Sequence, residues 1–303
     1  MDSLFAQYLM NWLVLGSIYT LIAIGFSLLF GLMNVIHFSH GDVSMVAPFI
    51  ALAMLQALAG ALGGGLPAMA VALLVAVVVT GLIGIGADKL VIRRFRRSPA
   101  MMALVATVAL GTVVRELIRA IYPQGSNPKA FPTIMDGALP FGASHQPLQP
   151  FMIVAVSVVI VALMYLLLGK TPVGMRIRAV AEDVETARLM GIAPERIFAF
   201  TFFLASAVGA IGALFFATYA GVVRFDFGVQ LGLIGFSAAV VGGLGSMTGA
   251  ILGSLVIAGI ESVVQANMTD GSSYRLVFVF LLVIVMLCVR PTGLLGKTVV
   301  EKV

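Results

Sequence analysis

The densest group of polar side chains in the sequence lies at residues 37–42, between two long apolar runs. His37, Ser39, His40 and Asp42 fall together there, just after Asn34. Polar groups at membrane depth are costly in lipid and usually face a bundle interior or an aqueous cavity. A broken helix there would also expose free backbone groups to a substrate. We therefore expect Asn34, Ser39 and His40 to line a substrate path.

A structural role explains the same residues about as well. Asp42 and Ser39 are residue types that cap the start of a helix, and the two histidines can sit among lipid headgroups. His37 and His40 alone are too few ligands for a metal, and the sequence has neither a G-x-S-x-G nor an H-E-x-x-H motif. We expect no metal and no cofactor on this chain.

A second set of charges lies toward one end of two apolar runs. Arg115 and Arg119 close the run at 99–121, and Glu261 lies in the run at 249–267. No chain of carboxylates crosses the apolar runs, so a structural ion pair of Glu261 with Arg115 or Arg119 is favoured over a proton relay.

The segment 170–197 separates apolar runs and has helical periodicity. Its small and apolar positions share one face and its charged residues fall elsewhere: Val180, Val184, Ala187 and Gly191 against Glu182, Asp183, Glu185 and Arg188. Gly191 and Pro194 provide a stop. The carboxylates would be repelled by anionic lipid, so this short amphipathic helix is expected to dock on a protein partner.

The composition shows that the elements that position these residues lie in a membrane. Hydrophobic residues make up 61% of the 303 residues, charged residues 10%, and the mean hydropathy is +1.12. These values exclude a soluble globular protein and a disordered one. The lone cysteine, Cys288, excludes a disulfide framework. The net charge of +5 is no sign of nucleic-acid binding here, because the placement of the charges has to be read against the membrane.

Nine apolar runs approach the roughly 20 residues that a helix needs to cross a bilayer. They are 8–32, 43–62, 66–87, 99–121, 150–169, 197–222, 229–247, 249–267 and 274–290. The glycine-punctuated runs at 43–62 and 229–247 are candidates for broken or re-entrant helices, so the range is eight to ten crossings. We expect an all-α polytopic membrane helix bundle that forms one domain over 1–303.

Basic residues gather in three places that the positive-inside rule makes cytoplasmic. They are Lys89, Arg93, Arg94, Arg96 and Arg97; Lys170, Arg176, Arg178, Arg188 and Arg196; and Arg290, Lys297 and Lys302. Clusters on the same side of the membrane must be separated by an even number of crossings. The expected runs place two crossings between the first and second clusters and four between the second and third. We expect the N terminus outside and the C terminus in the cytoplasm, with 170–197 as an inner loop.

The outer segment 122–149 carries five prolines, a density that predicts an extended segment without helix or sheet. It is either a docking surface or a plain connection. Two stripes of small residues at four-residue spacing indicate close helix packing: Ala205, Gly209, Ala213, Ala217 and Gly221; and Gly245, Gly249 and Gly253.

A Gly-Lys-Thr tripeptide at 296–298 superficially suggests a nucleotide-binding loop. That loop needs a glycine five residues before Gly296, where this chain has Pro291. The chain therefore is not expected to hydrolyse ATP itself, and any ATPase must be a partner.

Several stretches resemble known importers. Residues 174–191, with Glu182, Asp183, Ala187 and Gly191, are similar to the coupling segment of ABC-importer permeases. The whole chain resembles the H subunit (LivH-type) family of high-affinity branched-chain amino-acid permeases, through residues 16–19, 23–25, 34, 38–41, 239–246 and 291–296. Ser39 departs from the alanine that is common in that family, which leaves urea or short amides open as substrates.

The resemblance implies the partners. It implies a second homologous permease subunit, two cytoplasmic ATPase subunits that use ATP and Mg, a periplasmic substrate-binding protein, and a location in the bacterial inner membrane. The turns near 31–42 and 221–228 also suggest an inverted repeat. An ion-coupled secondary transporter is the rival, and it would need a titratable site at mid-membrane.

Overall fold

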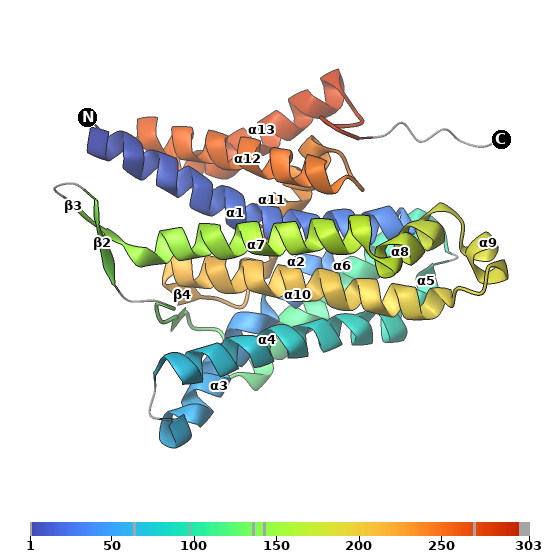
Figure 1. Ribbon diagram of the computed structural model, residues 1–303, viewed down its shortest axis with the longest axis horizontal. Helices are drawn as coiled ribbons and strands as arrows, with labels where there is room; N and C mark the ends of the chain where they lie inside the picture. The colour runs from blue at the N-terminus through green and yellow to red at the C-terminus, as the bar shows by residue number, and fades with distance from the viewer. Residues whose placement is uncertain are drawn as a thin grey trace.

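The computed structural model describes residues 2–62, 65–96, 98–134, 137–141, 144–268 and 271–296, and most of them are helical (Figure 1). Within these ranges seven helices are long and apolar enough to cross a membrane, and two shorter apolar helices cover Phe227–Gly242 and Ser273–Val289. The expected all-α polytopic bundle is confirmed. The nine expected runs correspond to these seven and two helices. Arg97, Lys297 and Lys302 of the basic clusters lie outside the described residues.

The main helices follow the apolar runs closely. They are α1 (Asp2–Met33), α3 (Val46–Leu62), α4 (Leu66–Ala87), α6 (Ala100–Ile121), α7 (Leu148–Lys170), α10 (Pro194–Ala220), α11 (Phe227–Gly242), α12 (Met247–Asn267) and α13 (Gly271–Val289). Short helices join them: α2 (Ser39–Ser44), the π-helix η1 (Asp88–Ile92), α5 (Arg93–Phe95), α8 (Pro172–Glu182) and α9 (Val184–Leu189).

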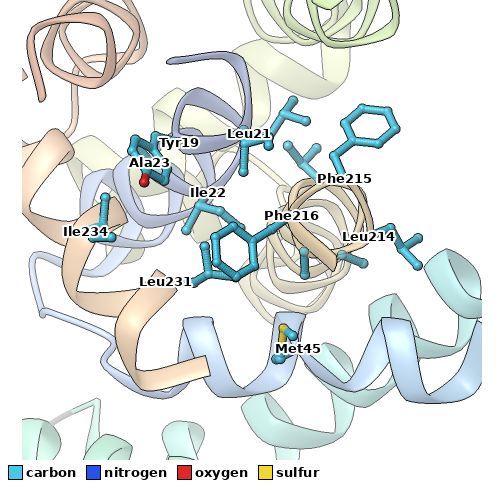
Figure 2. Packing of buried hydrophobic residues seen from close by; sticks show 14 of the residues in the cluster. Tyr19, Leu21, Ile22, Ala23, Met45, Leu214, Phe215, Phe216, Leu231 and Ile234 are labelled. Atoms are coloured by element: carbon cyan, nitrogen blue, oxygen red, sulfur yellow. The ribbon is translucent and has the colours of Figure 1, made fainter. Parts of the chain in front are cut away.

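Helix α1 occupies the centre of the bundle. It is apolar around its whole circumference, which is typical of a helix buried on all sides. Figure 2 shows Tyr19 and Ile22 of α1 beside Phe216 of α10 and Leu231 and Ile234 of α11. In contrast, only 17% of the most apolar window of α6, and likewise of α7, is buried inside the chain. Those two helices must be covered by lipid or by another subunit.

Small residues let the helices approach closely, as their spacing predicts. A Cβ atom at Gly253 of α12 would lie 2.1 Å from the carbonyl oxygen of Ala238 in α11, and one at Gly209 of α10 would lie 2.2 Å from Ser44 Oγ in α2. Neither position has room for a side chain. The small-residue stripes therefore serve as helix-packing surfaces.

The second apolar run is a broken helix. Pro48 has no N–H group, and its ring would clash with the carbonyl group of Ser44 in a continuous helix. The chain accordingly turns at Met45, between α2 and α3. This break places the short α2 in the middle of the bundle (Figure 1).

The segment 122–149 contains two short pieces of sheet, so the expectation of no sheet is wrong. Strand β1 (Lys129–Ala130) pairs with β4 (Val222–Val223), and β2 (Ala138–Phe141) pairs with β3 (Ser144–Pro147), both antiparallel. Each ladder is a lone pair of very short strands, and proline is tolerated in such edge strands. Residues 135–136 and 142–143 lie outside the described part. We call the end that carries β2 and β3 the hairpin end, and the opposite end, with α8 and α9, the coupling end (Figure 1).

The tail 291–296 folds back on the bundle. The N–H groups of Leu294 and Leu295 donate to the carbonyl groups of Val241 and Gly242, at 2.9 and 2.8 Å. The glycines at this contact leave no space for side chains, since a Cβ at Gly293 would lie 2.6 Å from Gly243. The tail therefore closes the exposed carbonyl end of α11.

Candidate functional site

The chain reverses direction at the end of α1. Asn34 has φ +52°, and its N–H donates to the carbonyl group of Phe30 at 2.7 Å. Asparagine tolerates this left-handed conformation at a helix end better than most residues. Asn34 is exposed at the coupling end. Its left-handed conformation is enough to explain an asparagine at this position, as the residue that ends α1. Nothing in this geometry assigns it to the path.

The segment after Asn34 is anchored to neighbouring helices. The Ser39 hydroxyl and His37 Nε2 lie 2.9 Å apart, and the His37 ring stands edge-on to Phe202 of α10. The N–H of Phe38 donates to Thr107 Oγ1 of α6 at 3.2 Å. These contacts hold the start of α2 between α6 and α10, with His37 and Ser39 buried.

His40 fills the space between α1 and α10. A Cβ at Gly25 would lie 2.2 Å from His40 Nε2, and one at Gly209 would lie 2.9 Å from His40 Cε1. Phe26 packs against the imidazole at 4.8 Å between centroids. Among the described residues neither ring nitrogen has a partner in normal hydrogen-bond geometry. The two glycines thus make room for a buried imidazole.

Asp42 lies inside α2 and points between two helices. A Cβ at Gly111 of α6 would lie 2.5 Å from Asp42 Oδ2, and one at Gly228 of α11 would lie 2.6 Å from Asp42 Oδ1. The residue at the N-cap of α2 is Phe38, with no side-chain capping bond, so capping of α2 by Ser39 or Asp42 is wrong. The reason is that the polar side chains turn toward α6, α10 and α11 instead of toward the free N–H groups of their own helix.

A cavity of about 500 Å³ begins beside this cluster. Its walls include Met33 and Val35 from the reversal, Thr107 of α6 and Phe198 of α10. Ser39 and His40 lie deeper, almost without exposed surface. The cluster is therefore closed in this conformation, and the cavity approaches it from the coupling end.

Glu261 has other partners than the sequence suggested. Its fully buried carboxylate accepts hydrogen bonds from Tyr19 at 2.6 Å, from Arg275 at 2.9 Å and from Gln265 at 3.2 Å. The expected pairing with Arg115 or Arg119 is replaced by this cluster, because α12 packs against α1 and α13.

The two arginines of α6 make local contacts instead. Arg119 bonds Glu116, one turn away on the same helix, at 3.2 Å. Arg115 donates to Thr112, also on α6, at 3.2 Å.

The segment 170–197 forms two helices where one was expected. The break falls at Asp183, whose carboxylate caps α9 by accepting from the N–H of Thr186 at 2.6 Å. Glu182 and Asp183 are exposed, and Gly191 is exposed with φ +79°. The pair α8–α9 projects from the coupling end (Figure 1).

The apolar face of this pair turns inward, which corrects the expected docking face. Val180 and Ala187 are buried against Leu32 and Ile197 of the chain's own bundle. This face covers the ends of α1 and α10, which would otherwise be exposed to water. Leu189 and Met190, which the periodic pattern did not single out, are 88% and 78% exposed. Their signal was a pair of large apolar residues directly before the Gly191 stop.

Comparison with known proteins agrees with this architecture. Residues 8–287 match the family described as branched-chain amino acid transport system / permease component. The chain is 33% identical to the high-affinity branched-chain amino acid transport system permease protein BraD of Pseudomonas aeruginosa, over 99% of this chain and 98% of that protein.

It is 30% identical to the permease protein LivH of Escherichia coli K12, over 99% of this chain and 98% of LivH. It is 28% identical to a probable branched-chain amino acid transport permease protein LivH of Methanocaldococcus jannaschii, over 94% and 90%. The family match covers all the helices and strands described above except the first residues of α1 and the last two residues of α13. The chain belongs to the family of permease components of branched-chain amino acid transport systems.

Proposed function

We propose that this chain is the membrane-spanning permease subunit of an ATP-driven importer that moves branched-chain aliphatic amino acids across the bacterial inner membrane by alternating access. The observation that carries the proposal is the family match along nearly the whole chain. The exposed α8–α9 pair supports it, because a subunit without its own nucleotide site needs a surface through which an ATPase can act.

The proposed assembly contains a second homologous permease, two cytoplasmic ATPases that use ATP and Mg, and a periplasmic binding protein. The chain itself covers little of α6 and α7, which leaves surfaces on which the second permease can pack. The binding protein is placed at the hairpin end, on segment 122–149. The N terminus is then periplasmic, and the coupling end, with Arg93, Arg94 and Arg176, is cytoplasmic.

The proposed substrate path passes the break between α1 and α2. An aliphatic amino acid needs an apolar cavity with a few polar groups that bind its ammonium and carboxylate weakly enough to release it. Asn34, Ser39 and His40 remain the proposed polar groups, with Ser39 and His40 closed off in this conformation. Asn34 lies at the mouth and is the first that a substrate leaving toward the coupling end would meet.

The structure gives little support to an ion-coupled transporter. Glu261 is held by Tyr19 and Arg275, so its charge is neutralised within the bundle. Asp42 packs between α6 and α11 with no second carboxylate near it in the described contacts. Neither group resembles one step of a proton relay.

Competition in vesicles that contain the whole complex tests the substrate class. Unlabelled leucine, isoleucine and valine should each suppress uptake of labelled leucine, whereas urea and acetamide should need at least about tenfold higher concentrations, because an apolar pocket discriminates by the side chain that fills it. Alanine is a matched control with a smaller side chain. Equal competition by urea or acetamide would assign the chain to the amide-transporting alternative.

A further inference from the structure

An ion-pair network joins α4 to α10 at the coupling end. Asp88, the first residue of η1, forms an ion pair with Arg96, which follows α5. Arg96 Nη1 also lies 3.1 Å from Glu195 Oε2 in the first turn of α10, and Arg93 Nε lies 3.2 Å from the same oxygen. The Arg96 guanidinium stacks on Phe198, 3.7 Å from the ring centroid. One arginine thus connects two helices that are far apart in the sequence.

This network is not an ordinary surface salt bridge. Asp88 is 2% exposed and the Arg96 side chain 14%. Burial of a charge pair carries a desolvation cost, so apolar residues at the same positions would often give equal or greater stability. Exposed pairs on this chain, such as Glu116 with Arg119, carry no such cost. The buried pair therefore calls for an explanation besides stability.

The location of the network suggests that explanation. Glu195 lies in the first turn of α10, and Phe198, on which Arg96 stacks, belongs to one buried apolar cluster with Val180 and Ala187 of the α8–α9 pair and Leu32 of α1. Asp88 begins a π-helical turn at the end of α4, and such turns are frequent at functional sites. The network therefore connects the exposed docking pair to the end of a membrane-spanning helix.

The 500 Å³ cavity gives the docking pair room to move. Arg93, Arg96 and Glu195 line it together with Glu185 and Arg188 of α9. The remaining walls include Met33 and Val35, which lead directly into the α1–α2 break. A displacement of α9 would change this cavity and would pull on Glu195.

We propose that Arg96, held by Asp88 and Glu195, is the positioning residue that transmits movement of the α8–α9 pair to the ends of α4 and α1. This proposal rests on the proposed function, because it presumes an ATPase that moves the pair. Arg96 suits the task because its planar fork bonds two carboxylates at once while its face stacks on Phe198. Asp88 and Glu195 are not among the residues proposed to contact substrate or nucleotide.

The test uses Glu195→Gln in the complete complex in vesicles. Glu195 is half exposed, so its neutralisation leaves Asp88 paired with Arg96 and no buried charge alone. We expect the complex to assemble and to hydrolyse ATP at the wild-type rate, while uptake per ATP hydrolysed falls about tenfold, within the range of typical coupling between sites. Glu195→Asp, which retains the charge, should recover part of the loss.

The matched control is Glu116→Gln, which neutralises an exposed carboxylate paired with an arginine at a similar distance. It should leave the uptake per ATP hydrolysed unchanged. The double variant Asp88→Asn, Arg96→Gln removes both buried charges together and should be uncoupled like Glu195→Gln. A wild-type ratio in both Glu195→Gln and the double variant would overturn the proposal, as would a loss of assembly in both. If wild-type complex shows no ATP-dependent uptake at all, the proposed function fails instead.

Discussion

Alanine substitution of Leu189 and Met190 together is expected to detach the proposed ATPase subunits from the permease. These side chains are 88% and 78% exposed at the tip of α9, outside the membrane-spanning helices. Neighbouring large apolar side chains that are exposed outside the membrane-spanning helices mark an interaction site. Loss of such anchors typically weakens a protein interface by about 30-fold or more. Co-purification of the ATPases in mild detergent, and uptake by the complex, should both be lost.

The matched control is Leu66→Ala. Leu66 is 69% exposed at the start of α4, toward the opposite end of the bundle. Its variant should retain the ATPases and transport normally. ATPase binding that survives in the Leu189, Met190 variant, with normal uptake, would move the docking surface away from the tip of α9. The exposed Glu182 and Asp183 would then be the next candidates.

Substitution of Gly41 by alanine is expected to destabilise the bundle and to lower its transport. Gly41 lies where α2 crosses α11, and its Cβ would be 2.3 Å from the carbonyl oxygen of Gly228 and 2.6 Å from the Cα of Gly232. Both obstacles are backbone atoms, so no side chain can rotate away. Overpacking of a close contact costs about 1–3 kcal/mol or more. The thermal unfolding midpoint in detergent should fall by several degrees.

Gly232→Ala tests the same crossing from the other helix. A Cβ at Gly232 would lie 3.5 Å from the Cα of Gly41, an ordinary van der Waals distance. This variant should keep a near-wild-type unfolding midpoint and normal uptake. Equal stability of the two variants would show that α2 and α11 are farther apart than described.

The sequence predicted the elements better than their contacts. Apolar runs of about 20 residues predicted the bundle because lipid requires every backbone group to be bonded within a helix. A break at 43–62 was also expected from the glycines in and beside that run, although Pro48, which enforces it, was not part of the expectation. The small-residue stripes of α10 and α12 were predicted as packing surfaces for the same local reason.

Contacts between distant segments were not predictable in this way. Glu261 could pair with any arginine at a similar depth, and only the packing of α12 against α1 and α13 selects Arg275. The direction of the α8–α9 pair depends likewise on the ends of α1 and α10, which take up Ala187 and leave Leu189 exposed. Periodicity identifies an apolar face, but it does not say whether the chain's own bundle or a partner covers that face.

Uptake by purified components in sealed vesicles tests the central claim most directly. The complete complex should accumulate labelled leucine when ATP and Mg are supplied on the side of the ATPases, and should stop when the ATP is replaced by a non-hydrolysable analogue. An imposed proton or sodium gradient without nucleotide should give no accumulation, because no relay of ionisable groups is described across the bundle. Accumulation by this chain alone, driven by such a gradient, would contradict the account.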